Sequence, residues 1–192
     1  TAPYQVVGQE PTASGIRVVA ERAVSRKLSP ALEHLRVRQT LEVDQACRRV
    51  DVTTELVNES SAETGPRDLT IGFRYHLLPR CLADGGAITM RHGPNAVAFQ
   101  RQFARMLFAA PSEAAAKVRA LFGVAAEPVA IDAPEAVLSL PASPIRVTMA
   151  LAPAERFAGF DCWDGANQPT SSFEPFFAPV TIRPGETAQF SM

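Results

Sequence analysis

The feature that most constrains this chain is a period-two alternation of apolar and polar residues between closely spaced prolines and glycines. In residues 50–57, VDVTTELV, every second residue from Val50 to Leu56 is Val, Thr or Leu, and such residues share one face of a strand. Residues 37–43, VRQTLEV, repeat the pattern. The two segments are predicted to be neighbouring antiparallel strands, and the chain as a whole is predicted to be dominated by strands.

The same alternation, together with turn and capping residues, predicts the other elements. Further strands are predicted at residues 16–24, 87–90, 137–140, 145–151 and 158–163. Near the end, residues 183–186 (RPGE) carry Pro and Gly at the second and third positions of a type II turn, which predicts a terminal hairpin. Residues 112–123 break the pattern, because Ser112 is an N-cap residue and Gly123 a stop. We therefore predict an all-β antiparallel sandwich with one short helix near 112–123.

Length and charge bound the remaining possibilities. The 192 residues fit a single domain, 1–192, or a fragment of a longer protein. A formal net charge of −1 argues against nucleic acid or an anionic membrane as an electrostatically driven partner. No apolar run is long enough to span a membrane, and no targeting signal is visible. The three cysteines and three histidines are scattered, so neither a disulfide framework, a metal site nor a cofactor is predicted.

One predicted strand places two polar side chains together. In residues 69–77, LTIGFRYHL, the apolar set points one way, so Arg74 and His76 emerge on the opposite face. If this face is concave, an imidazole beside a guanidinium can bind the hydroxyl groups or the ring oxygen of a sugar. If the face is simply solvated, both are ordinary surface residues.

Two residues near the C-terminus are further candidates. Glu174 stands among phenylalanines in SSFEPFF, and a carboxylate desolvated by rings and away from cations suits a general acid or base. Alternatively, Glu174 faces water while the rings face the core. Trp163 lies next to a predicted polar turn that contains Asp161, Asp164 and Asn167. Its ring could stack on a sugar, or it could pack beneath the loop.

Three stretches, RVDVTTELVNESS (49–61), LTIGFRYHLLP (69–79) and FDCWDGANQPTSSFEPFFAPVTIRPGETAQF (160–190), together resemble the galactose-mutarotase-like superfamily. This large β-sandwich, sometimes called a supersandwich, occurs as aldose epimerases and as non-catalytic domains of carbohydrate-active enzymes. The resemblance implies that His76 is a sugar-binding histidine. It also implies that Glu174 matches the general base that removes the anomeric hydroxyl proton.

Two departures from that family shape the functional prediction. Family enzymes are longer, and the Gly-Pro setting of His92 does not match the second histidine, which protonates the ring oxygen. We therefore predict a carbohydrate-contacting accessory domain of a bacterial polysaccharide-processing protein, with periplasmic or secreted location preferred over cytoplasmic. Its substrate-binding residues would be Arg74, His76, Trp163 and Glu174.

Two alternatives stay open. The first is an aldose 1-epimerase-like enzyme with Glu174 as general base and His76 as a substrate-polarising group. The second is a packing domain without a ligand that supports a neighbouring catalytic domain or a homodimer. In that case protein would cover the face that carries His76.

Overall fold

The structure is a computed structural model that describes residues 4–24, 29–79, 82, 84–100, 105–109, 116, 120, 128–164 and 171–192. The chain forms two compact units. Unit 1 comprises Thr1–Ile71 and Val180–Met192, and unit 2 comprises Gly72–Pro179. Among the described residues, no helix has the length and apolar character needed to cross a membrane.

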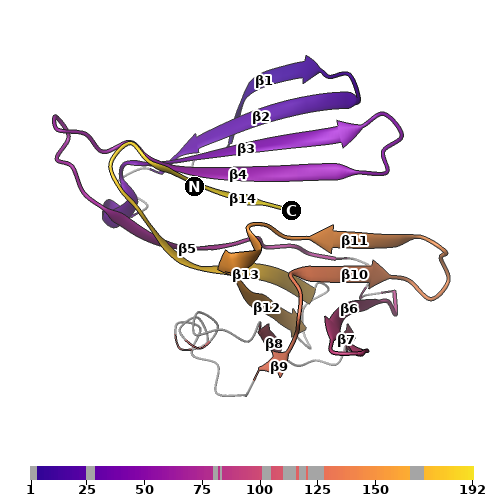
Figure 1. Cartoon of the computed structure of the whole chain (residues 1–192). Coiled ribbons are helices and arrows are strands. Elements are labelled where there is room, and N and C mark those ends of the chain that lie inside the picture. Colours follow the sequence, from indigo (N-terminus) through magenta and orange to yellow (C-terminus); the bar gives the residue numbers. More distant parts are fainter. Residues whose placement is uncertain are drawn as a thin grey trace. The chain divides into compact units, whose positions relative to one another are not determined.

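Unit 1 is built on one five-stranded antiparallel sheet with the order β1-β2-β3-β4-β14 (Figure 1). The strands are β1 (Gln5–Pro11), β2 (Gly15–Ala23), β3 (Leu35–Asp44), β4 (Val50–Asn58) and β14 (Thr187–Ser191). A 3-10 turn, Pro30–Leu32, precedes β3. The predicted pairing of residues 37–43 with 50–57 is confirmed, because Val37 lies opposite Leu56 and Leu41 opposite Val52.

The predicted terminal hairpin is wrong, although its turn is correct. Glu186 N donates to Arg183 O at 2.9 Å and Gly185 has φ 77°, as a type II turn requires. Beyond the turn, however, β14 pairs with β4, whereas β13 (Ser171–Ile182) lies in another sheet. Asn58 explains this divergence, because its backbone and side chain bind Gly185, Glu186 and Ile182 and so tie the turn to the end of β4.

Unit 2 carries two further sheets. The first has the order β11-β10-β6-β7 and the second β5-β13-β12-β8-β9. Every pairing whose register is defined is antiparallel except that of β8 with β9, which is parallel. β5 and β13 continue past the boundary of unit 2 into unit 1. The strands are β5 (Leu69–Arg74), β6 (Ala87–His92), β7 (Asn95–Gln100), β8 (Arg105–Ala109), β9 (Val129–Ala130), β10 (Glu135–Ser139), β11 (Arg146–Ala150) and β12 (Phe157–Asp164).

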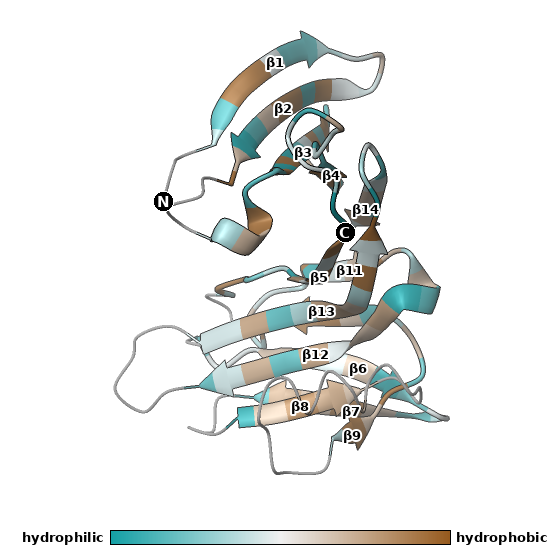
Figure 2. Cartoon of the chain, turned by 90° about the vertical axis from the view of Figure 1, so that its left-hand side faces the viewer, coloured by the Kyte–Doolittle hydropathy of each residue, from teal (hydrophilic) through white to brown (hydrophobic). Residues whose placement is uncertain are grey.

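Aromatic side chains dominate the buried core of unit 2. Phe160 and Phe173, from neighbouring strands, stack with ring centroids 4.9 Å apart, and Phe157 contacts Phe160 at the same distance. Phe177 joins them through an edge contact with Phe157. Polar residues, among them Asp161 and Glu174, are interspersed with apolar ones along β12 and β13, as the mixed hydrophilic and apolar colours of these strands in Figure 2 show. Nearly all residues of β12 and of the first half of β13 are buried, so both faces of the sheet are covered there.

The fold class is confirmed as an antiparallel β-sandwich, and the strands predicted at residues 16–24, 87–90, 137–140, 145–151 and 158–163 are all present. Apart from Ala116 and Ala120, which are helical, the helix predicted at 112–123 lies outside the described residues. Whether residues 1–192 fold as a single domain stays a prediction.

Candidate functional site

The register of three strands in unit 2 brings polar residues to one face of a sheet. Asp161 of β12 lies directly opposite Glu174 of β13, and Trp163 lies opposite Arg105 of β8. Paired residues share a face, as do residues two apart along one strand. Arg105, Asp161, Trp163 and Glu174 therefore project from the same side of the sheet, which we call the Glu174 face.

Arg74, the last residue of β5, and His76, which follows that strand, also lie on the Glu174 face. Tyr75 N donates to Pro175 O at 3.0 Å, and Leu77 forms a bridge with Phe173. Tyr75 and Leu77 consequently lie on the core side, where Tyr75 is buried. Arg74 and His76 alternate with them and emerge beside Glu174. The predicted alternation of residues 69–77 is thus present in the structure.

Glu174 makes direct contact with both of these residues. His76 Nδ1 lies 2.7 Å from Glu174 Oε1, and Arg74 Nη1 lies 2.7 Å from Oε2. Oε2 has no aligned hydrogen-bond donor among the described residues, so the Arg74 contact is an ion pair rather than a directed hydrogen bond. The Glu174 side chain is only 9% exposed. A nearly buried carboxylate is therefore held in place from both oxygens.

The neighbours of Glu174 differ from the apolar setting that its sequence context suggests. A desolvated carboxylate away from cations would suit a general acid or base, but here a guanidinium and an imidazole are its direct partners. Phe173 points to the opposite, core side, where it stacks on Phe160. Phe176 shares the Glu174 face and is buried with Leu107 and Ala158. The strand's alternation separates rings that look clustered in the sequence.

Arg105 forms a second charged pair, which the sequence analysis missed. Its Nε lies 2.8 Å from Asp161 Oδ1 and its Nη2 2.5 Å from Oδ2, a two-pronged geometry that favours a strong ion pair. This hydrogen bonding raises the pKa of Arg105, and attraction to Asp161 and Glu174 adds to the effect while burial opposes it. Because Asp161 lies opposite Glu174 in the register, the two ion pairs are neighbours on the Glu174 face.

Trp163 and its neighbours divide between the two faces. Trp163 is 37% exposed on the Glu174 face. Asp164 is buried and accepts a hydrogen bond from Ser171 Oγ at 2.8 Å, so it joins the ends of β12 and β13 rather than facing a ligand. Asn167, also considered from the sequence, lies outside the described residues. The four predicted binding residues thus share one face, and two of them, Arg74 and His76, contact Glu174. Their role in binding stays a prediction.

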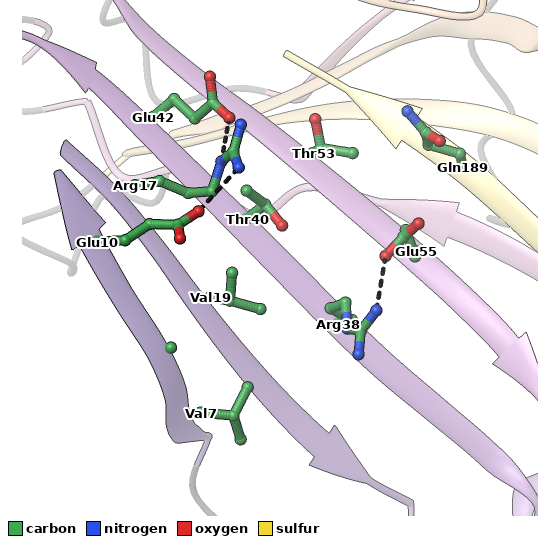
Figure 3. Close-up of a pocket in the computed structure, with 11 residues that line it drawn as sticks. Val7, Glu10, Arg17, Val19, Arg38, Thr40, Glu42, Thr53, Glu55 and Gln189 are labelled. Atoms are coloured by element: carbon green, nitrogen blue, oxygen red, sulfur yellow. Dashed lines mark hydrogen bonds and ion pairs between the residues drawn. The ribbon is translucent and has the colours of Figure 1, made fainter. Parts of the chain in front are cut away.

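A hollow of about 530 Å³ lies elsewhere, on the sheet of unit 1 (Figure 3). Its charged groups pair with one another: Arg17 reaches Glu10 at 2.9 Å and Glu42 at 2.5 Å, and Arg38 lies 3.8 Å from Glu55. None of the described residues that line it is aromatic or a predicted site residue. Its size does not make it the better candidate, because the Glu174 face combines a buried carboxylate, an imidazole and an exposed ring.

Among the described residues, no three His, Cys, Asp or Glu side chains come together as a metal site needs.

Comparison with known proteins gives an independent view of the fold. No protein-family model matches the sequence, and no curated protein matches it significantly. Solved structures do match over nearly the whole chain. A galactose mutarotase-like protein from Lactobacillus casei has 13% identity and a TM-score of 0.53, and the match covers 98% of this chain and 71% of that protein.

Two further structures resemble the chain in the same way. A galactose mutarotase-like protein from Clostridium acetobutylicum has 12% identity and a TM-score of 0.56, with 98% of this chain and 64% of that protein covered. A galactose mutarotase related enzyme from Lactobacillus acidophilus has 10% identity and a TM-score of 0.50, with 99% and 70% covered. This chain therefore spans between 64% and 71% of the length of these three proteins. At such low identities the likeness concerns the fold alone: the chain adopts the fold of galactose mutarotase-like proteins.

Proposed function

We propose that the Glu174 face of unit 2 binds a carbohydrate, and that the chain acts as a carbohydrate-contacting accessory domain of a bacterial polysaccharide-processing protein. The observation that carries this proposal is the contact of Glu174 with Arg74 and His76 on the face that also presents Trp163. Carboxylate, guanidinium and imidazole groups hydrogen-bond to sugar hydroxyls, and an exposed indole can stack on the apolar side of a sugar ring. The shared fold of galactose mutarotase-like proteins is consistent with this use of the sheet.

A glycan screen followed by calorimetry tests the proposal. We expect a mono- or oligosaccharide to bind the wild-type chain, and His76→Ala or Trp163→Ala to weaken its Kd by about tenfold, since each removes a hydrogen-bonding or stacking group. His92→Ala is the matched control, because His92 is an exposed histidine of the same unit at the end of β6. Absence of sugar binding, or equal binding by the His76 and Trp163 variants, would exclude the proposal.

A second candidate is an aldose 1-epimerase-like reaction. The observation in its favour is that His76 Nδ1 and Arg74 Nη1 fix the carboxylate of Glu174 at 2.7 Å each, as the orientation of a general base requires. In this reaction Glu174 would take the proton of the anomeric hydroxyl and His76 would polarise the substrate. The test is exchange of the α and β anomers of glucose and galactose by polarimetry. Rates equal to buffer, or unchanged in Glu174→Gln, would rule it out.

A further inference from the structure

The charged groups of the Glu174 face are arranged by depth. The side chains of Arg74 and His76 are 49% and 57% exposed, whereas that of their partner Glu174 is 9% exposed. The second pair repeats this order, with Arg105 at 38% and Asp161 at 5%. An approaching ligand therefore meets guanidinium and imidazole groups first. The carboxylates lie behind them and hold them in place.

Arg105 and His76 each have a nitrogen that takes no part in these pairs. A guanidinium has five N–H donors. The Asp161 contact engages Nε and Nη2 of Arg105, so Nη1 takes no part in it. His76 faces Glu174 through Nδ1, so its Nε2 takes no part in that contact, and the side chain is 57% exposed. Because Asp161 fixes the Arg105 fork in advance, a ligand would lose little freedom in ordering it.

We infer that the sugar bound on the Glu174 face is acidic and carries a carboxylate, sulfate or phosphate group. This inference rests on the proposed carbohydrate-binding function and names the substrate class of that site. The planar fork of arginine matches the paired oxygens of such groups, and charge-assisted hydrogen bonds are stronger than neutral ones. The sugar ring would stack on Trp163, which lies opposite Arg105 in the register, while its acidic group meets Arg105.

Calorimetry with matched sugars tests the inference on the complete chain. The probes are galactose against galacturonate, glucose against glucuronate, and glucose against glucose 6-phosphate and glucose 6-sulfate, with inorganic phosphate and sulfate as free anions. We expect the acidic member of at least one pair to bind about tenfold more tightly at low salt. This advantage should shrink at high ionic strength, since exposed charges are screened.

A paired variant keeps the test independent of folding. Arg105→Gln alone would leave Asp161 buried without its cation, so we combine Arg105→Gln with Asp161→Asn. The double variant should bring the ratio of the acidic to the neutral affinity close to one, and this ratio is the readout because both residues lie on the Glu174 face. Arg17→Gln is the control, because Arg17 is 42% exposed and pairs with two carboxylates in unit 1. It should leave both affinities unchanged.

The outcomes separate this inference from the function on which it rests. Equal affinity for neutral and acidic sugars would overturn the inference and leave the carbohydrate-binding proposal standing. Absence of binding by every sugar would overturn both. Free phosphate or sulfate that binds as tightly as the acidic sugars would also overturn the inference, because the site would then recognise an anion and not a sugar. An acidic preference unchanged in the double variant would show that Arg105 and Asp161 do not create it.

Discussion

At the scale of single residues, neighbouring positions of a strand lie on opposite faces of the sheet and therefore in different surroundings. Asp161 and Glu174 lie on one face with their cations, whereas Cys162, between Asp161 and Trp163, is fully buried on the other. Burial, followed by the nearby Asp161 and Glu174 carboxylates, raises the pKa of the Cys162 thiol well above its ordinary value. The thiol therefore stays protonated in the folded chain, in a position that solvent does not reach.

This difference predicts selective thiol labelling. Cys47 is exposed, so iodoacetamide at neutral pH should alkylate Cys47 long before Cys162. Mass spectrometry of tryptic peptides measures both sites, and labelling in denaturant is the control that shows Cys162 to be reactive once unfolded.

The Cys162 thiol has a higher pKa in the folded chain than in the unfolded chain. The stability that this thiol contributes is therefore present below the pKa of the unfolded thiol, about 8.5, and is lost as the pH rises further. Equal labelling of Cys47 and Cys162 in the folded chain would contradict this packing.

Asn58 is a second residue whose role rests on burial. It is fully buried, and its Nδ2 donates to Arg67 O at 2.8 Å and to Ile182 O at 2.9 Å, while its Oδ1 accepts from Ser60 N at 3.1 Å. Asn58→Ala should lower the free energy of unfolding by about 3 kcal/mol, because it leaves buried backbone groups without partners. Urea denaturation measures the change. Asn95→Ala, at an exposed position of β7, should change it by less than about 0.5 kcal/mol.

At the scale of elements, β12 depends on a glycine where it departs from regular pairing. The register of β12 with β13 shifts between Phe157 and Gly159. A Cβ atom on Gly159 would lie 2.0 Å from Phe108 O and 2.9 Å from Phe176 Cζ, and the carbonyl belongs to the backbone of β8 and cannot rotate away. Close approach of β8 to β12 therefore requires glycine.

Gly159→Ala should accordingly lower the free energy of unfolding by about 3 kcal/mol or more, through forced separation of β8 and β12. Gly72 provides the control within the same sheet, since a Cβ there meets nothing within 4 Å. Gly72→Ala should be neutral or stabilising by up to about 1 kcal/mol. Thermal and urea unfolding of both variants compare the two positions. Similar stability of the two would argue against the close approach.

Sequence alternation predicted which face each residue of a strand occupies, and it failed where partners are distant in the chain. It placed Arg74 and His76 on the same face, because alternate residues of one strand share a face whatever the strand pairs with. Their contact with Glu174 required the resemblance of two separate segments to one family. The pairing of Arg105 with Asp161 was not predictable, since it depends on the register of β8 against β12 across 56 residues. The hairpin prediction failed because β4 competes for β14.

At the scale of the whole molecule, both ends of the chain build unit 1. β14 near the C-terminus pairs with β4, and it buries Phe190 and Ala188. The sheet of unit 1 is therefore complete only when residues far apart in sequence have come together, which slows folding. β14 adds the burial of Phe190 and Ala188 to a sheet whose other four strands are consecutive in the chain.

Removal of β14 tests this dependence. Deletion of residues 187–192 should expose the amides of β4 to hydrogen exchange, because their partners on β14 are gone. Phe190→Ala, which keeps the backbone pairing, should lower the free energy of unfolding by about 3–5 kcal/mol through the cavity it leaves. Gln189→Ala, at an exposed position of the same strand, is the control. Unchanged protection of β4 after the deletion would show that β14 is dispensable.

Tryptophan fluorescence offers the most direct measurement of whether the Glu174 face binds sugar, because Trp163 is the single tryptophan of the chain and lies on that face. Titration with the oligosaccharide selected by the glycan screen should shift or quench the emission with the Kd found by calorimetry. The same titration of Glu174→Gln should show a much weaker response, since Arg74 and His76 lose the carboxylate that positions them. Calorimetric binding with no change in Trp163 emission, or an undiminished response in Glu174→Gln, would place the sugar elsewhere on the molecule.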